Sequence, residues 1–326
     1  MINIIIPCYN SSETLPDTLN SLISQTKKRF IVTIVDDCST ENIDNLIKKY
    51  KEKLSIKYIK LDKNVGPGMA RQAGIDSNSM CDYIMFLDSD DMLMPQAIEV
   101  LSREANLKKP DLLISSFIQQ NKYGIDKVIK AENSFTWLHG KVYKSEFLKE
   151  NNIRFSEGLR LNEDGSFNTK VLGMTDNIYK IPTITVLWID NKNSLTRKDK
   201  NFFINCIPDF LRGQVYSLNF LIEKNKFQKN KDKVALGITY IYNYLQFYLY
   251  YKKQIDKEIR EILESLFKKE EVKNAFITDG TFLEIIAEGL TDKNTKGLVY
   301  FDVQTFSDFL KDFNIKVGEN NENSFD

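Results

Sequence analysis

Three aspartates lie close together after an apolar run, which indicates a site for a cation. The stretch FLDSDDMLMP places Asp88, Asp90 and Asp91 directly after YIMFL. Burying an unpaired carboxylate is costly, and neighbouring carboxylates raise each other's pKa. Two or three aspartate oxygens suit Mg²⁺ or Mn²⁺, so the pattern favours a divalent cation. The alternative is a solvated turn in which Asp90 or Asp91 caps the helix that follows.

A second acidic pair, Asp36 and Asp37 in IVDDCST, also follows an apolar run. A carboxylate at the end of a parallel strand could accept the imide N–H of a nucleotide base, which favours Asp37, although the turn could equally be a helix cap. The stretch NVGPGMARQAG matches neither dinucleotide nor P-loop spacing. Its Arg71 nevertheless lies on a predicted helix beginning beside a glycine turn, where it could contact phosphate or ribose.

The elements that position these groups alternate along the first half of the chain. We predict strands over INIIIP, FIVTIVDD, IKYIKL and DYIMFLD, separated by amphipathic helices. Such alternation is typical of parallel β-α units whose sheet is buried on both faces. Ligands bind at the carboxyl ends of strands in these sheets. The polar residues at those ends are Tyr9, Asn10, Asp36, Asp37 and Asp88 to Asp91.

The pattern changes in the second half of the chain. DLLISSFIQQ and YKIPTITVLWI read as further strands, and long helical stretches rich in lysine and aromatic residues follow. We therefore predict an α/β fold with a mostly parallel central sheet and a C-terminal α-helical domain, divided into residues 1–204 and 205–326.

Composition excludes several classes of function. Lysine plus arginine equals aspartate plus glutamate, at 45 each, so we expect no nucleic-acid partner. Four scattered cysteines and one histidine argue against a zinc site or disulfide framework. We recognise no signal peptide and expect a cytoplasmic protein. The uncharged stretch 234–251 reads as a buried helix, because its polar side chains are costly in a membrane. Its basic flanks leave open a peripheral contact with the inner membrane face.

The sequence blocks together resemble family-2 glycosyltransferases with the GT-A fold. The blocks are IIIPCYNSSETLPDTLNSLISQT, IVDDCST, NVGPGMARQAGI, YIMFLDSDDMLMP and WLHGKVYKSEFLKENNIRFSEGLRLNEDGSF. They occur in the family's order and span about residues 1 to 200. The resemblance implies transfer of a sugar from a nucleoside diphosphate sugar, by family habit a UDP-sugar, to an acceptor hydroxyl.

The resemblance also implies roles for individual residues. Asp90 of the DxD motif would ligate Mn²⁺ or Mg²⁺, with Asp91 as a helper, and Asp164 of the ED pair would be the catalytic base. Glu163, Trp137 and His139 are candidates for contacts with the acceptor. The donor contacts that the resemblance implies are Pro7, Tyr9, Asn10, Asp37, Asn64, Arg71, Asp88, Ser89, Ser194 and Arg197. One departure is that no histidine follows His139, whereas some relatives use a later histidine as a metal ligand.

Two other functions stay open at this point. The chain could be an inactive subunit that binds a sugar nucleotide and acts through its helical half, although the intact DxD and ED blocks argue against this. A nucleotidyltransferase is the other alternative, but PCYN is not the glycine-rich N-terminal motif of that class. The acceptor could be a cell-surface polysaccharide, teichoic acid, another glycan or a protein. Asp164 could alternatively cap the helix GSFNTKVL, and the helical half could support a homo-oligomer.

Overall fold

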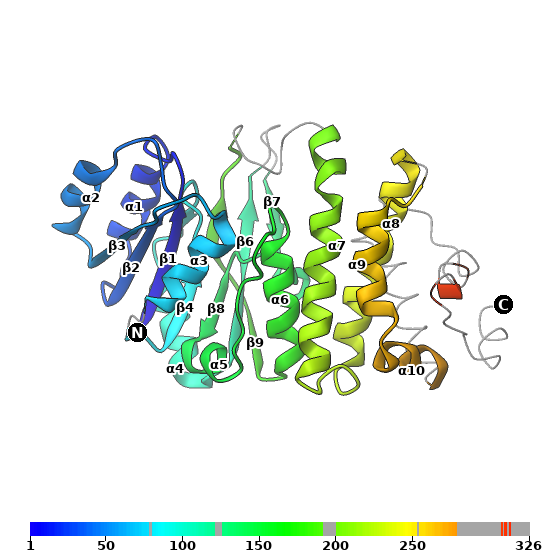
Figure 1. Ribbon diagram of the computed structural model, residues 1–326. Coiled ribbons are helices and arrows are strands. Elements are labelled where there is room, and N and C mark those ends of the chain that lie inside the picture. The colour runs from blue at the N-terminus through cyan, green and yellow to red at the C-terminus, as the bar shows by residue number, and fades with distance from the viewer. Residues whose placement is uncertain are drawn as a thin grey trace. The chain divides into compact units, whose positions relative to one another are not determined.

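A computed structural model describes residues 1–77, 80–120, 126–191, 200–252 and 254–278, and four positions between 308 and 313 (Figure 1). The chain divides into two compact units. The first comprises Met1–Gly158 and Thr175–Arg197, and the second comprises Leu159–Met174 and Lys198–Asp326. The stretch 305–313, TFSDFLKDF, whose spacing also predicts a short helix, lies largely outside the described residues.

The first unit is built on a mixed sheet. Its strands are β1 (Ile2–Cys8), β2 (Phe30–Asp36), β3 (Ile56–Lys60), β4 (Tyr83–Phe86), β5 (Met92–Leu93), β6 (Leu112–Gln119), β7 (Lys127–Ile129), β8 (Lys141–Lys144) and β9 (Ile178–Trp188). The order is β3-β2-β1-β4-β8-β6-β9-β5, and β7 pairs with β6. The first four strands are parallel, as predicted from the alternating pattern. β8 is antiparallel to both β4 and β6, whereas β9 is parallel to β6.

Helices cover both faces of this sheet, which explains the continuous apolar strands. The helices are α1 (Leu15–Ile23), α2 (Asp44–Lys51), α3 (Pro67–Asp76), α4 (Ala97–Lys108) and α5 (Ser145–Glu150). Ile4 and Ile6 share a core with Leu19 of α1. On the opposite face α3 lies so close to β1 that a Cβ at Gly74 would lie 2.4 Å from Ile5 Cγ2. A side chain at position 74 would therefore require α3 or the Ile5 side chain to shift.

The second unit is helical. It contains α6 (Glu163–Met174), α7 (Lys200–Glu223), α8 (Lys231–Lys252), α9 (Lys257–Phe267) and α10 (Glu270–Thr278). Helix α7 contacts α6, α8 and α9. The buried Asp209 of α7 accepts hydrogen bonds from Arg160 Nε and Arg212 Nη1, at 2.7 and 2.6 Å.

The two units divide the chain differently from our predicted domains in two respects. We placed residues 159–174 in the first domain and ended that domain at residue 204, but α6 belongs to the second unit and residue 204 lies within α7. The physical reason is the contact of α6 with α7, which the sequence order of the motifs does not reveal.

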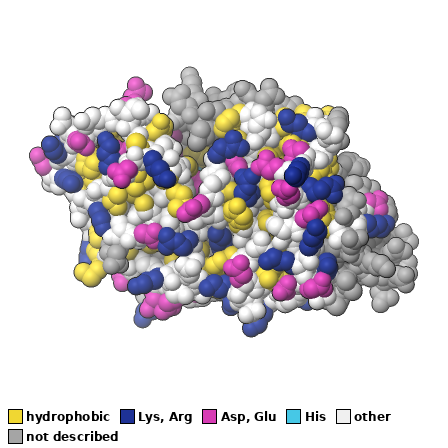
Figure 2. Space-filling model, in the orientation of Figure 1, with side chains coloured by type: hydrophobic (Ala, Val, Ile, Leu, Met, Phe, Trp, Pro, Cys, Tyr) yellow, Lys and Arg dark blue, Asp and Glu magenta, His cyan; other side chains and the backbone are white. Residues whose placement is uncertain are grey.

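Charged side chains of both signs are mixed on the surface, and the uncharged stretch of the second half forms a helix. Figure 2 shows acidic and basic side chains interspersed over the face in view. Among the described residues, no helix combines the length and the apolar character needed to cross a membrane. The stretch 234–251 instead forms most of α8, and Ile238, Ile241 and Leu245 are fully buried there.

Candidate active site

The sheet topology brings the acidic motifs to one edge. β1, β2 and β4 are parallel, so their carboxyl ends, followed by Tyr9, Asp37 and Asp88, share that edge. Two antiparallel steps, from β4 to β8 and from β8 to β6, restore the direction, so β9 also ends there. Because β8 runs the opposite way, His139 just before it lies at the same edge. We call this edge, with residues 7–11, 36–40, 64–66, 86–91, 137–140 and 188–191, the strand-end rim.

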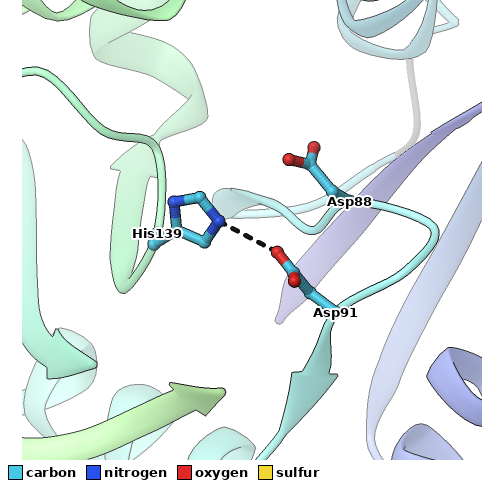
Figure 3. Close-up of side chains that lie close together, drawn as sticks. All are labelled: Asp88, Asp91 and His139. Atoms are coloured by element: carbon cyan, nitrogen blue, oxygen red, sulfur yellow. Dashed lines mark hydrogen bonds and ion pairs between the residues drawn. The ribbon is translucent and has the colours of Figure 1, made fainter. Parts of the chain in front are cut away.

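Asp91 is the most deeply buried carboxylate of the DSDD turn. Its side chain is fully buried, and its Oδ1 accepts the backbone N–H of Ile189 at 2.9 Å. Its Oδ2 lies 2.9 Å from Nε2 of His139, and Figure 3 shows this imidazole facing the carboxylate. Burial raises the pKa of Asp91 to about 6, although the hydrogen bond from His139 opposes that rise. Asp91 thus ties three separate segments together.

Asp88 and Asp90 are more accessible than Asp91. The Asp88 side chain is 37% exposed, and its Oδ1 lies 2.6 Å from Nη2 of the buried Arg71. Burial disfavours the Asp88 carboxylate, but the charges of Arg71 and His139 outweigh it and hold its pKa below the usual value. Burial and the charge of Asp88 raise the pKa of Asp90, whose Oδ2 accepts a hydrogen bond from Asn191 Nδ2 at 2.8 Å.

The imidazole of His139 is held between aromatic rings. Its centroid lies 5.2 Å from that of Phe117 and 4.7 Å from that of Trp188, and both pairs are stacked. Trp137 meets Phe117 edge-on at 5.9 Å. This packing fixes the plane of the imidazole and therefore the direction of its bond to Asp91.

Asp37 organises the turn that follows β3. Its carboxylate accepts the backbone N–H groups of Val65 and Gly66 at 2.7 and 2.8 Å, and its backbone oxygen accepts from Asn64 Nδ2 at 3.2 Å. Gly66 has a φ of 86°, which favours glycine. Asp37 is buried, so a base would have to share oxygens that already bind backbone groups. The predicted contact with a base stays a prediction.

The remaining rim residues are linked to one another. Asn10, at a φ of 49°, accepts hydrogen bonds from the N–H and hydroxyl of Thr40 through its Oδ1. Ser89 bonds Ser11 at 2.8 Å. Pro7 is the penultimate residue of β1, and Tyr9 beyond its end is 50% exposed. Ser194 and Arg197 lie outside the described residues.

The ED pair belongs to the other unit. Glu163 and Asp164 are the first two residues of α6, and Glu163 is buried. Asp164 Oδ1 accepts the backbone N–H of Gly165 at 2.7 Å, so the carboxylate supports the first turn of the helix. Asp164 lies inside α6 and not before it, so this bond is not the helix cap that we considered, and the catalytic role of Asp164 stays a prediction.

The donor set at the strand-end rim fits a divalent cation. One potential ligand atom each from Asp88, Asp91 and His139 lies within 4.8 Å of the others. Carboxylate oxygens with an imidazole nitrogen suit Mn²⁺, whereas Mg²⁺ prefers oxygen alone. Asp90, our predicted ligand, is outside this group of three among the described residues and stays a prediction. Both oxygens of Asp91 already have partners, so the accessible Asp88 is the member best placed to bind a cation.

The sequence analysis did not identify two residues that take part in the rim. Asn191 holds Asp90, and Trp188 stacks on His139. Both come at the end of β9, and the polar dipeptide after that strand, Asp190 and Asn191, was the available signal. Using it required knowing that β9 runs in the same direction as β4.

Comparisons with known proteins agree with this fold. A family model for glycosyl transferase family 2 matches residues 3–161. TarP of Staphylococcus aureus, a poly(ribitol-phosphate) beta-N-acetylglucosaminyltransferase, is 31% identical over 257 residues, which cover 71% of this chain and 75% of TarP. TarS of Staphylococcus aureus, which carries the same enzyme name, is 30% identical over 182 residues, covering 52% of this chain and 32% of TarS. The chain thus spans about a third of the length of TarS.

A solved structure supports the fold. The crystal structure of residues 1–349 of Staphylococcus aureus TarS in complex with UDP-GlcNAc superposes with a TM-score of 0.67 at 20% identity. The match covers 96% of this chain and 88% of that one. The likeness extends through the helical second half of the chain, where we recognised no motif.

Proposed function

This chain belongs to glycosyl transferase family 2, and we propose that it transfers a sugar from a UDP-sugar to a hydroxyl of a polyol-phosphate polymer, inverting the anomeric carbon. The acceptor class is proposed because relatives are named as poly(ribitol-phosphate) glycosyltransferases. The donor follows from the resemblance of the rim motifs to those that bind nucleoside diphosphate sugars.

The convergence of acidic and basic groups at the strand-end rim carries the proposal. Asp88, beside Arg71 and within reach of His139 and Asp91, forms a compact polar group at the end of β4. Asp37 with its glycine turn and the exposed Tyr9 lie at the ends of neighbouring strands. A nucleoside diphosphate offers a base for one part of such an edge and a charged diphosphate for the other.

The residues at the rim would divide the work of binding the donor. Asp88 and Asp90 would hold Mn²⁺ or Mg²⁺, which when bound neutralises charge on the departing diphosphate. Arg71 would exchange part of its contact with Asp88 for a phosphate or ribose oxygen. Asp91 and His139 would keep the turn in place, because their hydrogen bond and the aromatic stack resist rotation of either side chain.

Asp164 would accept the proton of the attacking hydroxyl. A single displacement needs a base on the face of the anomeric carbon away from the leaving diphosphate, and it inverts the anomeric configuration. General base catalysis of this kind contributes about 10²–10⁴-fold to the rate.

The proposal is tested by offering the protein a panel of nucleotide sugars with a synthetic ribitol-phosphate oligomer, with and without Mn²⁺. We expect release of UDP that depends on both the oligomer and the cation, and a product of inverted configuration by NMR. Transfer from another nucleotide class, activity unchanged by a chelator, or retained configuration would each contradict one part of the proposal.

A further inference from the structure

Helix α6 packs against α7 and α8 in the second unit, where Figure 1 shows the three helices. Asn162, just before the ED pair, donates a hydrogen bond from Nδ2 to the backbone oxygen of Phe210 at 3.4 Å. A Cβ at Gly213 would lie 3.4 Å from the same Nδ2. The first turn of α6, which contains Asp164, is thus fixed beside the middle of α7.

Rings from α7 and α8 form a connected group next to this turn. The aromatic cluster consists of Phe203, Phe210, Tyr240, Tyr244, Phe247 and Tyr251. Phe210 and Tyr244 have the closest ring centroids of the group, at 4.5 Å. All six side chains are only partly buried. Phe210 is the member that Asn162 bonds, and Tyr244 is the ring closest to Phe210.

The Tyr244 hydroxyl lies near the segment that carries Asp164, because Tyr244 packs on Phe210 and Phe210 is bonded by Asn162. Among the described residues its phenol has no hydrogen-bond partner. Burial, the neighbouring Tyr240 and the charge of Asp164 all raise the pKa of Tyr244. The phenol is therefore protonated at neutral pH and can donate a hydrogen bond as well as accept one.

We propose that Tyr244 binds the acceptor polymer beside Asp164, its ring packing on the polyol carbon chain and its hydroxyl bonding an acceptor hydroxyl. This inference rests on the proposed function, because it takes Asp164 as the base and a polyol phosphate as the acceptor. An acceptor hydroxyl must reach Asp164 to lose its proton, so side chains that surround this carboxylate meet the acceptor.

The chemistry of the aromatic cluster suits this occupant. Helix α8 ends in the exposed Lys252, whose charge complements that of phosphodiesters. Aromatic faces pack well on C–H groups, and tyrosine hydroxyls satisfy polar groups at the same contact. A polyol chain presents both kinds of group along its length.

The test compares Tyr244→Phe and Tyr244→Ala with the control Tyr216→Phe, which removes an exposed hydroxyl from α7 outside the cluster. Transfer to a synthetic ribitol-phosphate oligomer, hydrolysis of the UDP-sugar without acceptor, and UDP affinity are measured for each. For Tyr244→Phe we expect the acceptor KM to rise about threefold to tenfold, the range that one hydrogen bond provides. Tyr244→Ala should raise it further, and Tyr216→Phe should leave all three quantities unchanged.

Donor hydrolysis separates an acceptor contact from a structural role. If Tyr244 only supported α6, hydrolysis and transfer would fall together, because both need Asp164, and that result would overturn the inference. An unchanged acceptor KM in Tyr244→Phe and Tyr244→Ala would overturn it as well. If wild-type protein released no UDP with the oligomer, the proposed acceptor would fail, a result distinguishable from either of these. Melting temperatures confirm that each variant is folded.

Discussion

The side chains of the strand-end rim and those of the aromatic cluster are positioned by contacts of different sequence separation. At the rim each carboxylate is held by groups distant in sequence, as when Asp91 meets His139 across 48 positions and Ile189 across 98. In the cluster, Tyr240 and Tyr244 or Phe247 and Tyr251 stand four residues apart on one helix, where side chains are neighbours by geometry. The rim therefore depends on the whole sheet, whereas two of the cluster's five ring contacts come from i,i+4 spacing on α8.

The strand-end rim and the aromatic cluster should also differ in how they respond to substitution. Polar groups at the rim are expensive to bury and are each matched to a partner. Rings in the cluster tolerate varied neighbours because their attraction is less directional. We expect substitutions at the rim to affect specific functions or stability sharply, and those in the cluster to act by degrees.

The largest effect is expected on the rate of transfer when Asp164, the proposed base, is substituted. Asp164→Asn keeps the size of the side chain but removes the proton acceptor, so transfer should slow at least about a hundredfold. UDP affinity with Mn²⁺, measured by calorimetry, should stay as in wild type. A collapse of donor binding would instead make Asp164 a support of α6, and the base would then be sought first at Glu163.

Removing the accessible carboxylate Asp90 should affect binding more than folding. Asp90→Ala is expected to weaken Mn²⁺-dependent binding of UDP by roughly tenfold or more, since a hydrogen bond or ligand bond to a charged group is worth about 1.5–3 kcal/mol. The melting temperature should change little. If calorimetry gave the same cation-dependent UDP affinity as wild type, Asp90 would not be a ligand.

At the neighbouring Asp91, we expect substitution to lower stability. Asp91→Ala leaves the N–H of Ile189 and the His139 ring without this buried acceptor, which should lower the free energy of unfolding by about 1–3 kcal/mol. Chemical denaturation measures this, with Asp90→Ala as the matched control one residue away. Equal stability of the two variants would show that the buried contacts of Asp91 contribute nothing particular.

The smallest expected change is in the free energy of unfolding when Lys170 on α6 is substituted, and this change should depend on pH. Burial lowers its pKa to about 8, so the unfolded chain binds the proton more tightly and stability rises with pH between about 8 and 10.5. Lys170→Met should raise the free energy of unfolding at pH 7 by on the order of 1 kcal/mol, with a smaller gain at higher pH. Lys224→Met is the control, because Lys224 is exposed beside the same Phe220 ring. A gain independent of pH would rule out the titration of Lys170 as its cause.

Sequence patterns predicted the rim's strands better than its contacts. The parallel β-α units and the acidic residues at their carboxyl ends follow from local periodicity and motif order. The partners of those acids do not, because Asn191 and Trp188 reach the rim only through the direction that β8 imposes on β6 and β9. The tie between Asp91 and His139 likewise depends on strand order, which no local pattern specifies.

For the helical half, the sequence predicted the helices but not which of them pack together. The uncharged stretch around Tyr244 was correctly read as a helix packed against neighbours, since its apolar side chains are buried in α8. The position of α6 beside α7 was not, because an amphipathic helix shows that one face is covered but not by which element. The helical periodicity that the sequence shows over residues 258–272 is divided in the structure into α9 and α10, with Lys268 as the C-cap of the first.

The aromatic stack around His139 gives the protein an optical probe of its own. The chain has only two tryptophans, Trp137 and Trp188, and both contact Phe117 in that stack. Selective excitation of indole therefore reports from one neighbourhood rather than an average over the molecule. Emission from Trp188, whose ring lies against an imidazole that is hydrogen-bonded to Asp91, should respond when a cation or nucleotide changes the local field. Titrations of unlabelled protein could then follow occupancy of the rim without an assay for turnover.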